Sequence, residues 1–485
     1  MRRYRAWEPT RGSHLVVTLR EGADPRALEE AAKRLRVKAH LLFSHSRERL
    51  LDEARSCERE RKVVPPDLTL EYRVRVHPKR MREVAARLRE LGEAAAAHIM
   101  PAVALPADLC RRLKARKEPP PVWTTSFAGR QGHLKSADEG GVDAVHARDT
   151  WGLPGQGKDV QIFHIESAWN AAHEDLVQNQ GGVLGTQSSD YCARQHGTAV
   201  WGVLGADAGG SGVTGICPEA YLRAMAVAWN ADPELTELPA TIRRAANALP
   251  AGDIILIEFQ HPGPPSFSEN DRRVGYIPPE WWPATFKAIK YATSKGVIVV
   301  EAAGNGRKNL GADVYDDGDG FAQTWKNPFK RANDRSDSGA ILVGAGAPPP
   351  EPHGTGIPSK GYGPDRSRLE FSNYGPPVDV QAWGHEVTTC GYGSLQGGEG
   401  QENRWYTDDF GGTSSAAPIV AGVLACVQGV LRAKGVSPLT PAEARELLRT
   451  TGTPQTNHPD RPVTERIGRR PDLKELIPAA LALRS

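Results

Sequence analysis

Three residue types in this chain, found at Ser414, His196 and Glu166, are those that nucleophilic catalysis requires. A serine hydroxyl is inert until a base removes its proton. A histidine can take that proton and return it to a leaving group, because imidazole titrates near neutral pH. A buried carboxylate can orient the histidine by accepting a hydrogen bond from its other ring nitrogen. Together these residues suit acyl transfer through a covalent intermediate.

Ser414 lies where a glycine-rich turn leads into an apolar segment, within residues 411 to 435. A helix with no polar face must be buried. The free N–H groups and the dipole at its N-terminus then stabilise negative charge as it develops. The same stretch is also compatible with an ordinary buried helix that begins at a turn of small residues. It becomes catalytic only if the rest of the chain supplies a base.

Two motifs connect this serine with a base. Residues 412 to 418 read Gly-Thr-Ser-Ser-Ala-Ala-Pro and resemble the serine motif of the subtilisin-like proteases (subtilases, peptidase family S8), Gly-Thr-Ser-x-Ala-x-Pro. Residues 196 to 202 read His-Gly-Thr-Ala-Val-Trp-Gly and resemble the histidine motif of that family, His-Gly-Thr-x-Val-Ala-Gly. The resemblance implies that Ser414 is the nucleophile and His196 the base.

The third member of the expected triad departs from the family pattern. The family has Asp-Thr-Gly-Ile-Asp-x-x-His-Pro-Asp-Leu, and residues 166 to 176 read Glu-Ser-Ala-Trp-Asn-Ala-Ala-His-Glu-Asp-Leu. His173, Asp175 and Leu176 hold the register, which places Glu166 at the aspartate position. Three interpretations stay open: Glu166 is the orienting acid, a carboxylate from elsewhere replaces it, or the chain is a weakened pseudoprotease.

An oxyanion donor is expected at Asn305. Residues 302 to 306 read Ala-Ala-Gly-Asn-Gly and resemble the family segment whose asparagine side chain binds the oxyanion together with the N–H of the nucleophile. Such a contact contributes roughly 3 kcal/mol to catalysis in comparable sites. Asn-Gly is also a common turn signal.

Substrate-binding residues are expected close to this donor. Residues 254 to 263 align with the family strand that pairs with the substrate backbone and walls the specificity pocket. The family usually has Ser-Leu-Gly where this chain has Glu258, Phe259 and Gln260. We assign these three residues and Gly304 to substrate binding, and the changed types leave the preferred substrate residue open.

Composition favours a globular protein of more than one domain. The chain has 485 residues, of which 39% are hydrophobic and 25% charged. The N-terminus lacks the apolar run of a signal peptide and no run of about 18 apolar residues occurs, so we expect a cytoplasmic protein with no membrane partner. The six cysteines have no Cys-x-x-Cys spacing, which predicts free thiols and no zinc site.

A metal site is considered in one acidic loop. Its carboxylates invite a calcium hypothesis, but no bidentate glutamate follows at the spacing of a known calcium loop. We expect a solvated loop and no cofactor. The residues concerned are Asp313, Asp316, Asp317 and Asp319.

Residues 1 to 110 predict a small α+β domain. Apolar patterns give the order strand, helix, strand, strand, helix, strand, which is that of a ferredoxin-like fold. The predicted strands cover residues 14 to 20, 37 to 43, 68 to 76 and 98 to 105, and the helices begin near Asp24 and Pro78.

Two roles are compatible with this domain. Subtilisin-like proteases often begin with a domain of this kind that assists folding and plugs the active site, so the resemblance implies an intramolecular chaperone and inhibitor. The same topology carries RNA-binding domains, but only Tyr72 and Phe43 could stack on bases here, so we do not expect a nucleic-acid partner.

The charge of the chain is divided unevenly. Residues 1 to 120 hold 28 lysines and arginines against 17 acidic residues, a net of +11, and the remainder is at −8. The two parts complement each other, or the basic part meets an acidic partner. A linker is expected over residues 111 to 141, rich in charge, proline and glycine, and a processing site between about residues 105 and 140 is as compatible with it as an uncleaved linker.

Residues 142 to 485 predict an α/β domain with a buried parallel sheet. Short apolar runs alternate with helical patterns, and in such sheets the chemistry gathers beyond the carboxyl ends of the strands. The expected strands cover residues 160 to 165, 221 to 228, 254 to 259, 297 to 302 and 341 to 343.

We therefore expect a subtilisin-like three-layer fold preceded by a ferredoxin-like domain. The expected function is that of a serine endopeptidase that hydrolyses proteins or peptides through an acyl-enzyme, with Ser414, His196, Glu166 and Asn305 as its catalytic residues. Two alternatives remain: a catalytically silent peptide-binding module on the same scaffold, and a regulated protease whose N-terminal domain recruits a partner.

Overall fold

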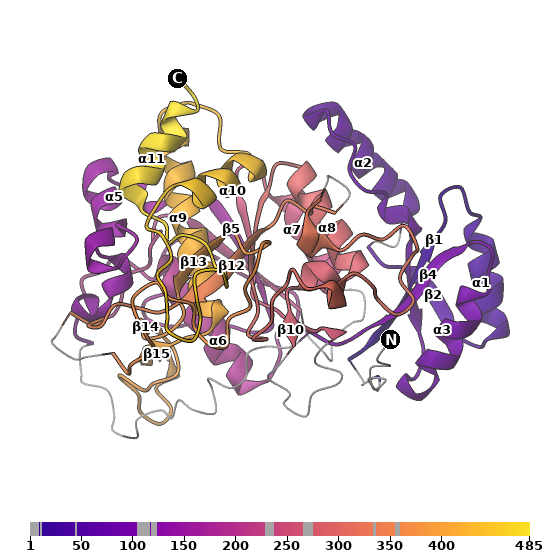
Figure 1. Ribbon diagram of the computed structural model, residues 1–485, viewed down its shortest axis with the longest axis horizontal. Helices are drawn as coiled ribbons and strands as arrows, with labels where there is room; N and C mark the ends of the chain where they lie inside the picture. Colours follow the sequence, from indigo (N-terminus) through magenta and orange to yellow (C-terminus); the bar gives the residue numbers. More distant parts are fainter. Residues whose placement is uncertain are drawn as a thin grey trace.

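The computed structural model describes residue 9, residues 12–43, 46–103, residue 117, and residues 124–227, 237–264, 275–332, 336–354 and 359–485. It contains a small antiparallel sheet near the N-terminus and a larger parallel sheet that positions the candidate site (Figure 1).

The small unit has four antiparallel strands in the order β2-β3-β1-β4, which is the ferredoxin-like arrangement expected from the sequence. Its strands are β1 (His14–Leu19), β2 (Lys38–Leu41), β3 (Glu71–Arg75) and β4 (Ala94–Met100). Its helices are α1 (Pro25–Arg34), α2 (Arg47–Arg61) and α3 (Met81–Arg89).

Two details of this unit differ from the prediction. Helix α2 was not expected, because it is highly charged and buries only Leu50 and Cys57, so its sequence has little apolar periodicity. The last strand, expected over residues 98 to 105, begins four residues earlier at Ala94, since the alanine run at 94 to 97 forms strand in contact with β1. Residues 104 and 105 lie outside the described residues.

The larger sheet has seven parallel strands in the order β13-β12-β11-β8-β5-β7-β6. Five of them fall on the expected apolar runs: β5 (Gln161–Glu166), β7 (Tyr221–Ala226), β8 (Ile254–Ile257), β11 (Ile298–Ala302) and β12 (Ile341–Gly346). The edge strands β6 (Gln180–Leu184) and β13 (Val380–Trp383) were not predicted.

Helices cover both faces of this sheet and complete three layers. The strand residues alternate between the two faces: Ile254 and Leu256 of β8 pack in the core that includes helices α6 and α9, and Ile255 and Ile257 pack in the core that includes α7 and α8. The helices are α5 (Ala144–Trp151), α6 (Tyr191–Gly205), α7 (Leu238–Ala248), α8 (Pro283–Ser294), α9 (Thr413–Ala433), α10 (Pro441–Thr450) and α11 (Leu473–Ala482).

Helix α9 runs through the middle of the larger unit (Figure 1). Among the described helices, α9 is the one that is long and apolar enough to cross a membrane. Its apolar stretch is entirely buried inside the protein. A central core helix has the same composition, so this feature is explained by packing.

The small unit is docked on the larger one beside α7 and α8 (Figure 1). Val16, Phe43 and Met100 belong to the same buried apolar cluster as the residues of those helices. Some ion pairs across the contact join a basic residue of the small unit to an acidic residue of the larger unit, and others join an acidic residue of the small unit to a basic residue of the larger one. The contact is therefore not simply a basic surface against an acidic surface. They join Arg73 with Glu237, Arg89 with Asp319 at 3.4 Å, Arg243 with Glu53 at 2.5 Å, and Lys287 with Glu71.

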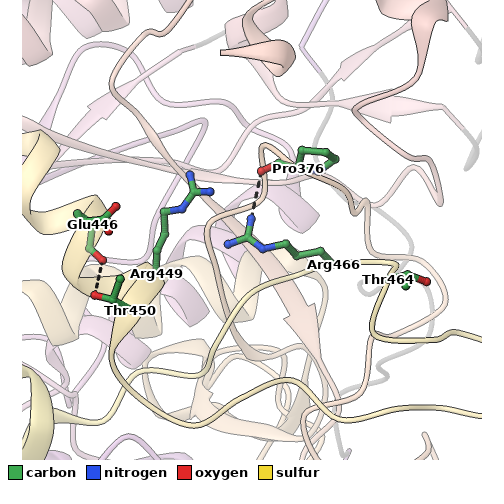
Figure 2. A pocket seen from close by; sticks show the side chains of 6 residues that line it. All are labelled: Pro376, Glu446, Arg449, Thr450, Thr464 and Arg466. Carbon is green, nitrogen blue, oxygen red and sulfur yellow. Dashed lines mark hydrogen bonds between the residues drawn. The ribbon is translucent and has the colours of Figure 1, made fainter. Parts of the chain in front are cut away.

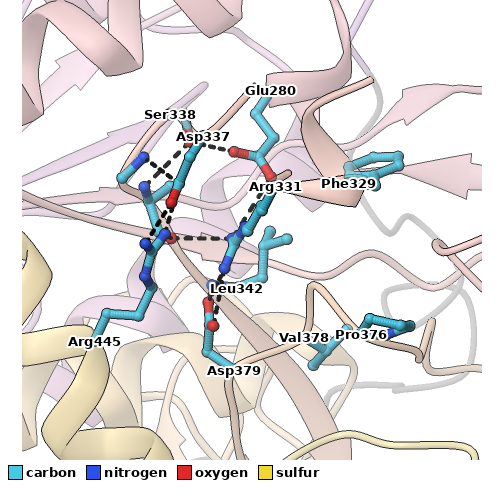
Figure 3. A network of polar contacts seen from close by, with 12 residues as sticks. Glu280, Phe329, Arg331, Asp337, Ser338, Leu342, Pro376, Val378, Asp379 and Arg445 are labelled. Carbon is cyan, nitrogen blue, oxygen red and sulfur yellow. Dashed lines mark hydrogen bonds and ion pairs between the residues drawn. The ribbon is translucent and has the colours of Figure 1, made fainter. Parts of the chain in front are cut away.

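A buried polar network anchors the segment between β11 and β12 (Figure 3). The Arg331 guanidinium donates to both oxygens of Asp379, at 2.9 and 2.8 Å, and Asp379 also accepts from the Leu342 N–H in β12. Asp337 accepts two hydrogen bonds from Arg445 of α10. These contacts fix the segment to the start of β12 and to helix α10.

The structure bears on the predicted linker and on the predicted free state of the cysteines. Half of the expected processing region lies outside the described residues, whereas Gln131, His133 and Leu134 of the predicted linker are buried against the larger unit. Cys57, Cys217, Cys390 and Cys426 are free and buried, but Cys192 is disulfide-bonded, so the prediction of free thiols is wrong at that residue.

Candidate active site

The Glu166 and His196 side chains meet at the carboxyl edge of the larger sheet. Glu166 ends strand β5, and its Oε2 lies 2.8 Å from His196 Nδ1 on helix α6. The Ser167 N–H donates to the other carboxylate oxygen at 2.8 Å. Glu166 is fully buried and His196 is 3% exposed. The glutamate is therefore placed where an orienting acid is needed.

The residues that follow His196 let helix α6 approach the end of β5. A Cβ added to Gly197 would lie 2.1 Å from the Ala168 carbonyl oxygen, so a larger residue would push the helix away from Glu166. The Thr198 hydroxyl donates to Arg194 O and accepts from the Asn170 N–H. The His-Gly-Thr motif thus has a packing reason for each of its positions.

Ser414 is the second residue of helix α9 and is buried. Its hydroxyl lies close to the Glu258 carboxyl group. Among the described residues, His196 Nε2 has no hydrogen-bond partner, so the imidazole nitrogen that would serve Ser414 is free to accept a proton.

Two hydrogen-bond donors converge beside the nucleophile. A Cβ added to Gly412 would lie 3.5 Å from Asn305 Nδ2 and 3.5 Å from the Ser414 backbone nitrogen. Asn305 is oriented by its own Oδ1, which accepts from the N–H and the hydroxyl of Thr413 at 2.9 and 3.0 Å. Asn305 Nδ2 and the Ser414 backbone nitrogen therefore lie on the same side of Gly412, close to the start of α9.

Two side chains that the sequence did not assign to this role hold the oxyanion loop. Gln260 Oε1 accepts from the Asn305 N–H at 2.9 Å, so Gln260 positions the donor. Asn373 donates from Nδ2 to the Ala303 and Tyr276 carbonyl oxygens and from its N–H to Gly304 O. No local pattern in the sequence indicates these backbone partners of Asn373.

The residues assigned to substrate binding are placed differently from one another. Gly304 has φ of +87°, and a Cβ there would meet Asn373 Nδ2 at 2.9 Å. Glu258 faces Ser414, whereas Phe259 points to the opposite side of the sheet and is fully buried in the apolar core. Gln260 is 6% exposed and bound to Asn305. The structure brings Glu258, Gln260 and Gly304 to the site but leaves Phe259 in the core.

Burial and charge act strongly on two groups near His196. Burial raises the pKa of Glu258 well above its ordinary value, the Ser414 hydroxyl lowers it, and the Glu166 charge raises it further. Burial lowers the pKa of His164 well below that of free histidine, and His196 lowers it further. His164 Nδ1 accepts from Trp169 Nε1 at 2.9 Å, so the wall behind the Glu166–His196 pair is made of neutral aromatic groups.

The acidic loop has cation partners from the protein itself. Lys330 pairs with Asp313 and Asp316, at 2.9 and 2.5 Å, and Arg89 of the small unit pairs with Asp319. Within the described ranges, no group of three or more histidine, cysteine, aspartate or glutamate residues is arranged to hold a metal ion.

A pocket of about 580 Å³ lies apart from these residues (Figure 2). Its lining includes none of the residues predicted for catalysis or substrate binding, and Arg466 in its wall donates to the Pro376 carbonyl oxygen. The lining residues are Pro376, Glu446, Arg449, Thr450, Thr464 and Arg466.

Comparison with known families and proteins gives a consistent result. Residues 156–468 match the sequence model of the subtilase family. The chain is similar to the major intracellular serine protease of Bacillus subtilis (strain 168), with 25% identity over 305 residues, which cover 59% of this chain and 74% of that protein.

Two solved structures share the fold. The epidermin leader peptide processing serine protease of Staphylococcus aureus superposes with a TM-score of 0.55 and 17% identity, over 96% of this chain and 98% of that one. Fervidolysin from Fervidobacterium pennivorans, a keratinolytic enzyme related to subtilisin, superposes with a TM-score of 0.54 and 16% identity. That match covers 96% of this chain and 61% of the fervidolysin chain. A match over 96% of the chain extends through most of the small N-terminal unit as well.

Proposed function

Because this chain belongs to the subtilase family of serine proteases, we propose that it is an endopeptidase that cleaves proteins or peptides with a Ser414-His196-Glu166 triad. The observation that carries this proposal is the 2.8 Å contact between Glu166 and His196 Nδ1. A glutamate here makes the same hydrogen bond that an aspartate would make, because the side chain ends at the imidazole nitrogen.

The proposed reaction follows from the positions of these groups. His196 Nε2 takes the proton of Ser414 as the hydroxyl attacks the scissile carbonyl carbon, and Glu166 stabilises the imidazolium that forms. Asn305 Nδ2 and the Ser414 N–H bind the negative oxygen of the tetrahedral intermediate. His196 then protonates the leaving amine. Water attacks the acyl-enzyme next, with His196 again as the base, and this step releases the carboxylic acid product and the free Ser414 hydroxyl.

The small N-terminal unit is proposed to act as an intramolecular inhibitor and folding aid. It is docked through an apolar cluster shared with α7 and α8. Beyond β4, the backbone of Pro101 and Ala102 lies beside the His261 imidazole in β9 (His261–Pro262), which directly follows the segment of Glu258 and Gln260. The chain thus leaves the small unit close to the expected substrate strand.

The inhibitory role can be tested in the full chain by a charge swap at the docking contact. Glu53→Arg places a like charge against Arg243, and Glu53→Arg with Arg243→Glu restores the pair. If docking restrains the site, the single variant reacts faster with an active-site probe and the double variant returns to the original rate. Equal rates for all three proteins contradict the inhibitory role.

A cytoplasmic location is proposed by similarity to a relative whose name describes it as intracellular. Cell fractionation with an antibody against the chain would test this, and recovery in the culture medium contradicts it. Calcium is not proposed to bind, and an unchanged unfolding temperature in excess chelator is the result expected.

Proteolysis itself is tested with an unfolded protein substrate and mass spectrometry of the products. The full chain should release peptides, and Ser414→Ala should release none. Peptide binding by both proteins with no cleavage by either would instead identify a silent binding module on the protease scaffold.

A further inference from the structure

Two glutamates stand side by side at the carboxyl edge of the larger sheet. Strands β5 and β8 are parallel neighbours, and Ile165 lies opposite Ile257 in their register. The next residues along the two strands are Glu166 and Glu258, so their side chains leave the sheet at the same level. Residues that face each other on neighbouring strands point to the same side.

Both carboxyl groups lie on the side of the sheet that α6 and α9 cover. Ile254 and Leu256 of β8 and Ile162 of β5 face that side, and Glu258 and Glu166 continue the alternation. The two glutamates are 1% and 0% exposed. Catalysis as described above uses only Glu166, so the second buried carboxyl needs its own explanation.

The groups around Glu258 come from three elements. Glu166 on β5 is its charged neighbour, His196 on α6 is hydrogen-bonded to Glu166, and Ser414 on α9 lies against the Glu258 carboxyl. Neither oxygen of Glu258 makes a hydrogen bond of good geometry with a described residue. A buried carboxylate without a cation beside it is costly, and a second negative charge at Glu166 adds to that cost.

Resting on the proposed function, we propose that Glu258 gates the nucleophile by its protonation state: the neutral acid permits attack by Ser414, and the carboxylate opposes it. In the neutral form the O–H group can donate to the serine oxygen. When the proton is lost to solvent, a negative charge stands beside the place where the tetrahedral oxyanion forms. Like charges a few ångströms apart in a buried site repel strongly.

The direction of the effect on activity follows. Burial and the Glu166 charge raise the Glu258 pKa well above its ordinary value, so the neutral acid persists to a higher pH than in a free glutamate. The rate of reaction at Ser414 should therefore pass through a maximum and fall on the alkaline side by about tenfold or more. An enzyme limited only by deprotonation of its histidine would instead reach a plateau.

A matched control is available on the neighbouring strand. Glu301 of β11 lies opposite Ile257, is fully buried, and has a pKa that burial raises well above its ordinary value. Because side chains alternate along β11, Glu301 points to the face of the sheet that α7 and α8 cover, away from Ser414. Glu301→Gln thus removes a comparable buried carboxyl without touching the nucleophile.

The test is the second-order rate of labelling by a fluorophosphonate, measured from pH 5 to 10 by mass spectrometry of the Ser414 peptide. The full chain should lose labelling rate at alkaline pH. Glu258→Gln, which resembles the neutral acid, should label without that alkaline loss, and Glu301→Gln should keep it. If Glu258→Gln does not fold, Glu258→Ser tests the same point with a shorter neutral side chain.

The outcomes separate the two claims. Labelling with the same alkaline loss in the full chain and in the Glu258 variants overturns the gating role and leaves the proposed protease intact. Loss of the alkaline fall in Glu301→Gln as well would also overturn it, because the effect would not be local to Ser414. No labelling of any protein at any pH overturns the proposed function and the gating role together.

Discussion

The Glu166 carboxylate accepts a 2.8 Å hydrogen bond from His196, and both side chains are buried. If Glu166 orients the imidazole as the proposed triad requires, Glu166→Gln should lower kcat by about 10² to 10⁴. KM should change little, since neither residue binds substrate in the ground state. Steady-state kinetics on a peptide substrate would measure this.

Glu166→Asp tests the length of the side chain at the same position. An aspartate is one methylene shorter than the Glu166 side chain that reaches His196 Nδ1 at 2.8 Å, so its contact with the ring should be longer and weaker. A loss of activity intermediate between the wild type and Glu166→Gln is expected. Full activity of Glu166→Gln would show that another group orients His196.

Asn305→Ala should lower kcat by about 10² to 10³, the effect of losing one oxyanion donor. The matched variant is Thr413→Val, which removes the hydroxyl bond to Asn305 Oδ1 but leaves the backbone N–H bond in place. That variant should lose much less activity. Equal losses in the two variants would mean that Asn305 acts by fixing the loop rather than by binding the oxyanion.

Gly412→Ala should abolish activity because the added methyl group occupies the space between Asn305 Nδ2 and the Ser414 N–H. Its φ of +100° also makes alanine strained there. Gly435→Ala is the matched control, since Gly435 has φ of +69° and open space around it. Each variant should lose about 1 kcal/mol of stability, but only Gly412→Ala should lose activity.

His98 should make the docked N-terminal unit sensitive to acid. Burial, together with the nearby Arg89 and Lys287, lowers the pKa of His98 to about 3, while Trp282 and Phe321 pack around the ring. The unfolded chain then binds more protons than the folded one between pH 6.5 and 3, so stability is complete above pH 6.5 and is lost as the pH falls. At pH 5 the loss from this group is at most about 2 kcal/mol.

Thermal unfolding at pH 7 and pH 5 measures this effect. His98→Leu should show a smaller drop between the two pH values than the wild type. His77→Leu, which changes an exposed histidine of the same unit, should show the full drop. If His98→Leu drops as far as the wild type, His98 is not the source of the acid sensitivity.

Motif and periodicity were enough to place much of this site. Ser414, His196 and Asn305 were predicted because each lies in a short motif, and the five central strands were predicted from continuous apolar runs. Glu166 was predicted by the register that His173, Asp175 and Leu176 hold, and the structure places its carboxylate against His196.

The remaining features depend on contacts between distant segments. The bond from the Asn305 N–H to Gln260 and the bonds of Asn373 to Ala303 and Tyr276 join side chains to backbone atoms of other loops, which no local pattern encodes. Phe259 was assigned to the substrate pocket, but strand alternation turns it to the opposite face from Glu258. Helix α2 and the edge strand β6 carry too little apolar periodicity to be read from sequence, and β13 is only four residues long.

The central claim is that Ser414 is a working nucleophile supported by His196 and Glu166. Its most direct test is intact and peptide mass spectrometry of the full chain after treatment with a fluorophosphonate at neutral pH, with Ser414→Ala as the control. We predict one covalent adduct on the peptide that contains Ser414, absent from Ser414→Ala and formed far more slowly by Glu166→Gln. No adduct on the full chain, and none on the Glu53→Arg variant whose N-terminal unit is loosened, would contradict the account.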